Sequence, residues 1–598
     1  MFPVPVRSAA GLAAVALVLC ALADPAAAAA APAAAAADQA AAPDVQEHVL
    51  ANGMKLLLVP RHLSPTVAAG WVAKVGSANE RPGITGISHL FEHMMFKGTR
   101  TIGTRDYELD KRLIDEQEAL QEQMRAEMLA QRDRLRRGEI ADVTSPEART
   151  PRFRALEARF DSLVVLQRDN MVKNEFDQVL SREGASRLNA FTSEDMTFYI
   201  MTVPANKLEL WFWMESDRLL NPVFREFYSE RDVVYEERRL RVESTPLGKF
   251  QESFDAMFWD ASPYTWPVIG YASDLPFITK RDADDYYATY YAPNNVCAVL
   301  VGDFDPKQAV ALAEQYFGRI PRGAVPPPPM ITMEPRQTGE KRFYGEAETN
   351  PAVTVRWHTV AVVHKDTPAL MVLAELLNGD TGRLRRNLVL GRGVANSARA
   401  GQDSRKYEGM FEIDAECKDG TSPQALEQAV HGEIAKLQAE PVGTDELQAV
   451  KNRYLTRTWR MLDGNFFQMI RYGAAEAQGS WRDADRIDRQ IQQVTAQDVQ
   501  RVAKEYFTTE NRAVATWTRL ASAAPEDPAL AGLSPQGRQM VQQSLARLDG
   551  LTSAAEVQEM LARMDQMGDR LPPEMKPAMD HVRIKAQEKL TQLQKEGQ

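Results

Sequence analysis

The stretch Gly86–Thr99, with the sequence GISHLFEHMMFKGT, decides the architecture of this chain. Neither proline nor glycine interrupts Ile87–Lys97, so a helix is predicted there. On a helix, His89 and His93 are four residues apart, and both imidazoles therefore project from one face, one turn apart. Glu92 borders the same face. The sequence predicts a helix that presents two imidazoles and a carboxylate side by side.

The order His-x-x-Glu-His is the inverzincin motif. Two imidazoles one turn apart suit a single Zn²⁺. Glu92 stands where it could take a proton from a metal-bound water. Short motifs also occur by chance, so the alternative is a surface helix with two unrelated histidines, and other segments must decide between the two.

Length and composition bound the class of protein. The chain has 598 residues, too many for one hydrophobic core, so two to four domains are expected. A hydrophobic fraction of 44% and a charged fraction of 26% are those of globular proteins. The net charge of −11 disfavours nucleic acid as a partner and leaves peptides and proteins open as substrates. No run of eighteen apolar residues follows the N-terminal segment, so no membrane span is predicted.

The N-terminal segment has the pattern of a secretory signal. Arg7 supplies a positive charge, Ala9–Ala21 is apolar, and Ala21–Ala23 reads as a cleavage site. We therefore expect a signal peptide over residues 1–23 and an Ala-rich linker over residues 24–44. The mature protein is expected to be periplasmic or secreted by a bacterium.

Residues 105–174 differ from their surroundings. Leucine and methionine recur there at helical spacing amid dense charge, and Gly138, Pro146 and Pro151 interrupt the pattern. This predicts a helical hairpin with one thin apolar stripe. Two interpretations stay open: a docking arm or lid, and a solvated insertion.

An internal repeat organises the rest of the chain. Residues 494–511 repeat the pattern of residues 278–295, with Thr, Asp, Tyr and Asn at matching positions, so a capped helix that leads into a strand is used twice. A tandem repeat is inferred. Thr367–Leu377, the helix of the second repeat that corresponds to the histidine helix, has no histidine. One metal site is therefore expected.

A catalytic zinc site needs a third protein ligand and leaves a fourth position for water. Glu236 and Glu237 lie on a predicted helix, Phe224–Val242. Glu230 lies seven residues before Glu237, nearly two turns, so these two share a face. One carboxylate can bind the metal while another braces the second nitrogen of a histidine. Spacing does not choose between Glu236 and Glu237, and a salt-bridged surface helix is the alternative.

Three ordered blocks resemble the pitrilysin–insulinase–mitochondrial processing peptidase family of zinc metallopeptidases. They are His89–Thr99, Asn189–Ser193 and Glu230–Glu237, and the resemblance covers about Val45–Leu520. It implies an α+β fold of two tandem repeats. Each repeat would be an antiparallel sheet with helices packed on one face, and the two together would form one half of a clam-shaped peptidase.

The resemblance also implies the roles of individual residues. In that family the two motif histidines and the last glutamate of the third block bind zinc, which assigns His89, His93 and Glu237 here. Glu92 would be the general base, and Glu230 would support a ligand from behind. The activity implied is a zinc endopeptidase that cleaves peptides or unfolded polypeptides.

The middle block implies how substrate is held. In the family this block forms an edge strand, so Asn189 and Ala190 would pair with the substrate backbone by β-augmentation. The separation between His93 and Glu237 is about twice the usual one for the family. The insertion at residues 105–174 accounts for the excess.

The chain departs from the family in the second repeat. Members carry an arginine and a tyrosine there, and the alignment places Val389 and Asn396 at these positions. We therefore expect a related partner subunit that carries the pair, in a heterodimer, or else a homodimer. One alternative is a non-catalytic peptide-binding or assembly subunit of the same fold. A purely structural zinc site is disfavoured, because such sites are rich in cysteine and none lies near these segments.

Two cysteines, Cys297 and Cys417, lie outside the expected signal peptide, and both are expected to have structural roles. The expected organisation of the chain has six parts. These parts are a signal peptide (1–23), an Ala-rich linker (24–44), a zinc-bearing repeat one (45–322, with the hairpin insertion at 105–174), a Pro-rich linker (323–340), an inactive repeat two (341–520) and a helical C-terminal extension (521–598).

Overall fold

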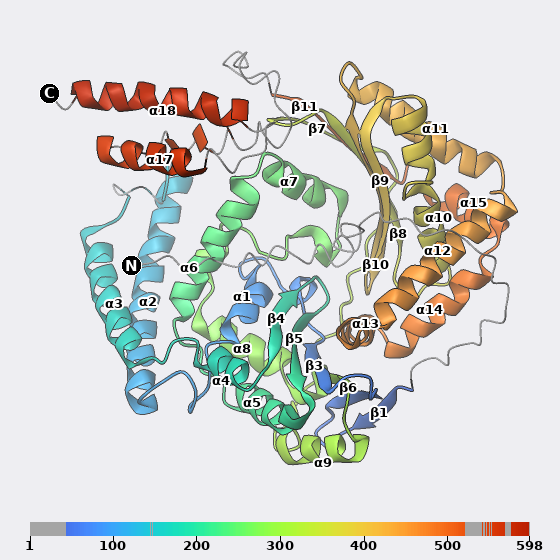
Figure 1. Cartoon of the computed structure of the whole chain (residues 1–598). Helices are drawn as coiled ribbons and strands as arrows, with labels where there is room; N and C mark the ends of the chain where they lie inside the picture. The colour runs from blue at the N-terminus through green and yellow to red at the C-terminus, as the bar shows by residue number, and fades with distance from the viewer. Residues whose placement is uncertain are drawn as a thin grey trace. The chain divides into compact units, whose positions relative to one another are not determined.

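The computed structural model describes most of the chain after the expected N-terminal segments (Figure 1). The described residues are 44–520, apart from 144, 146 and 147, and then 541, 544, 545, 547, 548, 551, 553–567 and 576–596. The expected signal peptide and nearly all of the Ala-rich linker lie outside them. The chain divides into two units, Met1–Thr518 and Arg519–Gln598, which are described separately.

Repeat one is built on a six-stranded sheet in the order β1-β2-β6-β3-β5-β4. All neighbouring strands are antiparallel except β2 and β6, which are parallel. The expected antiparallel sheet is therefore correct for every pair but this one. Parallel strands need a long crossover connection, and the segment between β2 and β6 is long enough to supply it. The strands are β1 Gln46–Val49, β2 Lys55–Pro60, β3 Thr66–Ala73, β4 Ser186–Thr192, β5 Thr197–Pro204 and β6 Val296–Gly302.

Helices of repeat one pack on one face of this sheet. Side chains from α1, α5, α6, α8 and α9 share a buried core with Trp71 of β3 and Tyr199 of β5. The opposite face is covered from repeat two, because Met469 and Tyr472 of α13 pack against β2, β3, β5 and β6. The helices are α1 Ile87–Met94, α4 Glu175–Arg182, α5 Leu208–Leu220, α6 Phe227–Arg238, α7 Gly248–Phe258, α8 Lys280–Tyr290 and α9 Pro306–Tyr316.

Repeat two has a five-stranded sheet in the order β7-β11-β8-β10-β9. Its strands are β7 Lys341–Ala347, β8 Ala352–Val360, β9 Ala395–Ser404, β10 Glu408–Cys417 and β11 Arg512–Arg519. Its helices are α10 Thr367–Leu377, α11 Pro423–Ala439, α12 Thr444–Leu462, α13 Asn465–Gln478, α14 Trp481–Gln493 and α15 Ala496–Tyr506, with a π-helical turn, η8, at Arg385–Gly391. Helix α10 has the bounds that the sequence predicts.

The two repeats match in detail as well as in outline. Helices α8 and α15 both begin with the predicted capping box of threonine and aspartate. In repeat one, the side-chain amide of Asn295 donates to the carbonyl of Tyr290 at 2.8 Å. In repeat two, that of Asn511 donates to the carbonyl of Tyr506 at 2.8 Å. The predicted tandem α/β architecture is confirmed.

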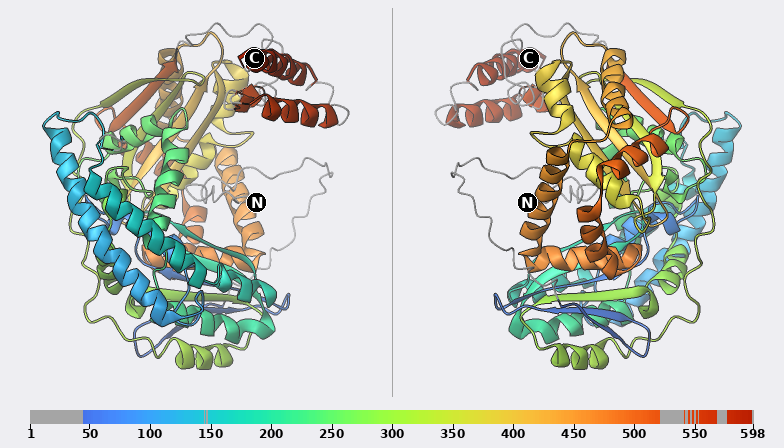
Figure 2. Two further views of the ribbon diagram at one scale, coloured as in Figure 1. Left: turned by 90° about the vertical axis from the view of Figure 1, so that its left-hand side faces the viewer. Right: turned by 90° about the vertical axis from the view of Figure 1, so that its right-hand side faces the viewer.

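The insertion is the predicted helical hairpin, formed by α2 (Tyr107–Arg136) and α3 (Pro151–Asn170), which lie side by side (Figure 2). Met124 and Phe160 are buried in the same core as the helices of repeat one, and the Phe160 ring lies 5.9 Å from that of Tyr228 in α6. The interpretation as a purely solvated insertion is therefore wrong.

The C-terminal unit contains the expected amphipathic helices, α17 (Ala554–Met567) and α18 (Lys576–Glu596). They pack on each other through buried side chains such as Val557 and Ala586. Of the helices in the part of the chain that the structure describes, none is long and apolar enough to cross a membrane.

Both cysteines behave as structural residues. Cys297 lies in β6 and Cys417 in β10, and both are buried and free. Burial raises the pKa of the Cys417 thiol to about 11. A thiol with a raised pKa is a poor nucleophile at neutral pH, which agrees with the predicted structural roles.

Candidate metal centre

Helix α1 is anchored at its first turn by a residue that sequence reasoning missed. The Glu80 carboxylate accepts hydrogen bonds from the backbone N–H groups of Gly86 at 2.7 Å and Ser88 at 2.8 Å. These are donors that a helix start leaves unpaired. Burial nevertheless raises the pKa of Glu80 to about 8. The helix ends at Met94, three residues before the predicted end, Lys97.

Three side chains converge beside α1. The Oε2 atom of Glu237 in α6 lies 3.8 Å from Nε2 of His89 and 3.5 Å from Nε2 of His93. One ligand atom from each residue lies within 4.8 Å of the others. Two imidazoles and one carboxylate are a donor set of catalytic zinc sites, which leave a fourth position open. These residues therefore fit a zinc ion.

The structure also separates the two glutamates between which the sequence left a choice. Glu237 faces the histidines and is largely buried. Glu236 points to solvent, with its side chain 56% exposed, and pairs with Arg239 at 2.9 Å. The predicted helix Phe224–Val242 is observed as α6 followed by a π-helical turn, η4, at Arg239–Glu243.

Glu230 lies behind His93, as predicted. Its Oε2 atom is 3.4 Å from Nδ1 of His93, and its Oε1 atom accepts from Lys97 at 2.5 Å. Burial opposes ionisation of Glu230, but the hydrogen bond from His93 and the charge of Lys97 outweigh it and lower its pKa to about 2. Burial likewise opposes charge on His93, yet Glu230 and Glu237 raise its pKa to about 9. The surrounding carboxylates thus favour positive charge at this position, as they would favour a bound cation.

His89 is in a different environment from His93. Burial lowers its pKa to about 3, with a further contribution from His93. The imidazole is therefore neutral, the form that binds a metal. No described residue hydrogen-bonds its Nδ1 atom, so this ring has no carboxylate behind it.

Glu92 is held next to the ligands by the end of β4. Its Oε2 atom accepts a hydrogen bond from the Thr192 hydroxyl at 2.8 Å. Burial raises the pKa of Glu92 above its usual value, although Thr192 opposes the shift. A raised pKa suits a carboxylate that must accept a proton near neutral pH. Thr192 belongs to the predicted middle block, but no sequence rule linked it to Glu92.

A cavity of about 480 Å³ opens beside His93. Its lining includes Glu92, Phe96, Asn189 and Ala190. The last two residues belong to β4, which pairs with β5 and forms the edge of the sheet. A strand edge offers free backbone donors and acceptors to an extended peptide. The predicted edge strand is therefore observed at the metal centre.

The two positions aligned with the arginine and tyrosine of the family have different side chains in this chain. Val389 lies in η8, half-buried against the core of repeat two. Asn396 is exposed on β9, and its amide donates to Glu416 at 2.9 Å and to the carbonyl of Cys417 at 3.1 Å. Neither offers a guanidinium or a phenol.

The fold and the site together define a two-repeat α/β protein with a candidate metal centre in repeat one. Two family models match the chain: "Insulinase (Peptidase family M16)" over residues 55–113 and "Peptidase M16 inactive domain" over residues 278–454. The chain thus resembles the insulinase family, peptidase family M16, in both repeats. The second description agrees with the lack of histidine on α10.

Named relatives span both repeats. The zinc protease PqqE of Helicobacter pylori is 25% identical over 476 residues, which are 78% of this chain and 90% of the relative. The probable mitochondrial-processing peptidase subunit beta of Arabidopsis thaliana is 21% identical over 502 residues, which are 79% of this chain and 78% of the relative. The family thus includes proteins named as zinc proteases and a protein named as a subunit.

Solved structures share the fold. A protease from Helicobacter pylori matches with a TM-score of 0.65 and 22% identity, over 80% of this chain and all of that one. The periplasmic protease PqqL from Escherichia coli matches with a TM-score of 0.59 and 16% identity, over 80% of this chain but 49% of that one. The described fold therefore corresponds to about half of the PqqL chain.

Proposed function

We propose that this chain is a zinc-dependent endopeptidase that cleaves peptides or unfolded polypeptides. The observation that carries the proposal is the convergence of His89, His93 and Glu237, with ligand atoms within 4.8 Å of one another, beside the half-buried Glu92. A free edge strand lies next to this group. Metal ligands, a base and a peptide-binding edge are the parts that peptide hydrolysis requires.

Each residue of the candidate site would have a separate role in hydrolysis. His89, His93 and Glu237 would hold the metal. A bound zinc ion polarises the scissile carbonyl and lowers the pKa of water. Glu92 takes the proton of the attacking water and passes it to the leaving amine. Glu230 holds the His93 ring through Nδ1 and so fixes the direction of its Nε2 atom.

Strand β4 would bind the substrate. Asn189 and Ala190 pair with Ile200 and Tyr199 of β5 on one side, and their other side is the sheet edge. An extended peptide added there gains main-chain hydrogen bonds without a requirement for particular side chains. This favours unfolded polypeptides over folded ones. The cavity between the edge strand and His93 would receive a side chain of the bound peptide.

We further propose that a second subunit completes the active site. Val389 has no polar group, and the amide of Asn396 already donates to Glu416 and to the carbonyl of Cys417. Neither position therefore supplies a free donor for the oxyanion of the reaction, and PqqL has a chain about twice as long as the part that matches. A related subunit with the arginine and tyrosine would form a heterodimer, and a second copy would form a homodimer. Gel filtration of the purified chain, with peptide hydrolysis measured across the peak, tests this. Full activity in a monomer would contradict it.

Export is also part of the proposal. Residues 1–23 have the signal-peptide pattern, and the protein would act in the periplasm or outside the cell. N-terminal sequencing of the protein from a periplasmic fraction tests this proposal. A chain that retains residues 1–23 in the cytoplasm would refute it.

Substitution of Glu92 tests the function. Glu92→Gln keeps the shape and removes the base, so hydrolysis of an unfolded peptide should fall by about 100-fold or more. Zinc affinity should stay near that of the wild type, because Glu92 is outside the proposed ligand set. The assay uses the chain alone and the chain with its related subunit. The second candidate is a non-catalytic peptide-binding or assembly subunit, which Val389 and Asn396 favour; unchanged turnover in the variant would support it.

A further inference from the structure

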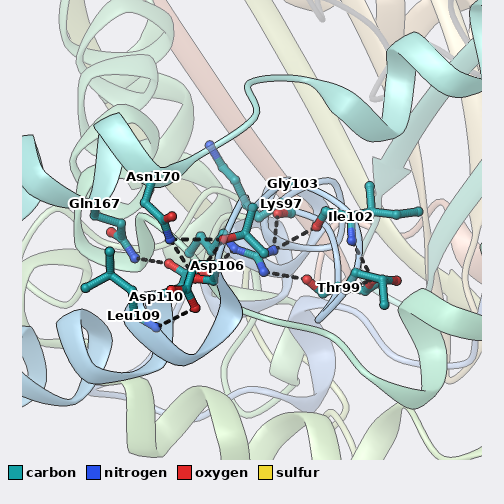
Figure 3. Close-up of polar contacts among 12 residues, drawn as sticks. Lys97, Thr99, Ile102, Gly103, Asp106, Leu109, Asp110, Gln167 and Asn170 are labelled. Atoms are coloured by element: carbon teal, nitrogen blue, oxygen red, sulfur yellow. Dashed lines mark hydrogen bonds and ion pairs between the residues drawn. The ribbon is translucent and has the colours of Figure 1, made fainter.

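A buried ion pair joins the insertion to the segment that precedes α6. Arg225 donates to the carboxylate of Asp110, and both side chains are fully buried. The other carboxylate oxygen of Asp110 accepts from Gln167 of α3 at 3.1 Å (Figure 3). A buried pair is costly unless its remaining polar groups are bonded, and here both oxygens of Asp110 are. The pair thus ties both helices of the insertion to Arg225.

The guanidinium of Arg225 in turn holds the loop that follows the metal-binding helix. It donates to the carbonyl oxygens of Lys97 at 3.1 Å and Ile102 at 3.0 Å, and also to that of Thr99. Gly98 lies inside this loop with a φ of +92°, and a Cβ there would lie 2.3 Å from the carbonyl oxygen of Ile102. The loop is therefore closed tightly around the guanidinium.

Lys97 connects this loop with the metal centre. Its amine donates to Glu230, which lies 3.4 Å from Nδ1 of His93. A second connection comes from α3, where Arg168 donates to Glu226 at 3.2 Å, and Glu226 accepts from Lys97 at 3.2 Å. Glu226 has a φ of 54°, a left-handed conformation that surrounding contacts must maintain.

We infer that the base of the insertion positions the metal centre. Asp110 is a positioning residue that acts through Arg225, Lys97 and Glu230 on the orientation of His93. This inference rests on the proposed zinc site and goes beyond it. A docking arm would need only a stable attachment to the rest of the protein. Here the residue to which the insertion is attached, Arg225, also donates to three carbonyls of the loop directly after the metal-binding helix. The insertion is therefore part of the apparatus that holds His93.

The test compares two substitutions on the same helix. Asp110→Asn removes the charge that holds Arg225. Leu113→Ala removes a buried apolar side chain one turn away and leaves the polar network intact. Zinc affinity of the folded proteins is measured by competition with a chelating dye, and the ligand geometry is followed by the absorption bands of bound Co²⁺. Asp110→Asn should bind zinc about tenfold more weakly, the lower end for groups behind a ligand, with altered bands. Leu113→Ala should lower the melting temperature without either change.

The outcomes distinguish failure of this inference from failure of the proposed zinc site. Wild-type zinc affinity and unchanged Co²⁺ bands in Asp110→Asn would overturn the inference. Equal losses in Asp110→Asn and Leu113→Ala would also overturn it, because general destabilisation would then explain both. If Asp110→Asn does not fold, Arg168→Gln takes its place under the same criteria, since it removes the second connection between the insertion and Lys97 at a half-exposed side chain. Failure of the wild type to bind zinc would contradict the proposed function instead.

Discussion

Substitution of Gly473 in α13 gives opposite expectations from the sequence and from the structure. Alanine is the better helix former by about 1 kcal/mol, so helix propensity alone predicts that Gly473→Ala stabilises the protein. In the structure, however, α13 covers the sheet of repeat one, and a Cβ at position 473 would lie 2.3 Å from the ring of Phe198.

The magnitude follows from that distance. Carbon atoms in contact are about 3.5 Å apart or more, so the ring or the helix must move by about 1 Å. Phe198 is fully buried and has little room to move. Overpacking of a core costs about 1–3 kcal/mol. After the gain in helix propensity of about 1 kcal/mol, Gly473→Ala should lower the free energy of unfolding by up to about 2 kcal/mol.

A matched control is available in α11. Gly432 also lies in a helix, and a Cβ there would meet no atom within 4 Å. Gly432→Ala should therefore raise stability by about 0.5–1 kcal/mol. Both variants are compared with the wild type by urea denaturation. If Gly473→Ala is as stable as the wild type or more so, the close packing of α13 on the first sheet is wrong.

Three further predictions concern the site and the junction of the repeats. Glu237→Gln should weaken zinc binding by more than about 100-fold, whereas Glu236→Gln should leave it unchanged in the same titration; equal effects would refute the ligand assignment. Thr192→Val removes a hydrogen bond that lowers the pKa of Glu92, so the acid limb of the kcat/KM profile should move to higher pH; an unmoved limb would contradict the contact. His358 of β8 lies at the junction, where its ring stacks on Phe258 of α7 with centroids 4.0 Å apart. Burial lowers the pKa of His358 to about 4, so the folded state disfavours its protonation. Its contribution to stability should be complete above about pH 6.5 and be lost as the pH falls toward 4, by up to about 3 kcal/mol. In His358→Gln that part of the pH dependence should vanish from denaturation curves, and its persistence would assign it to other groups.

Patterns among residues close in sequence predicted those parts of the fold that depend on local contacts. The capping box at Thr279 and that at Thr495 mark helix starts through contacts three residues long. Helical spacing in the motif placed His89 and His93 on one face, as observed. The parallel pairing of β2 and β6 was not predicted, because pairing between strands so distant in sequence has no local signal.

In the candidate site, too, local contacts were predicted from the sequence and contacts between distant residues were not. The ligand set depended on a family resemblance, because helical spacing left Glu236 and Glu237 equivalent until the structure showed which one faces the histidines. Glu80 anchors α1 from outside the motif, and no spacing rule connects the two. Asp110 and Arg225 lie far apart in sequence, and each would be expected on a solvated surface. Their pairing results from the packing of the insertion on repeat one.

The central claim is that His89, His93 and Glu237 form one zinc site. X-ray absorption at the zinc edge, on the zinc-loaded protein, tests this claim most directly. The account predicts one zinc ion per chain with two imidazole ligands and oxygen ligands at about 2.0–2.2 Å. Loss of one imidazole is predicted for His93→Ala. A spectrum with sulfur ligands, or a protein that binds no zinc, would contradict the account.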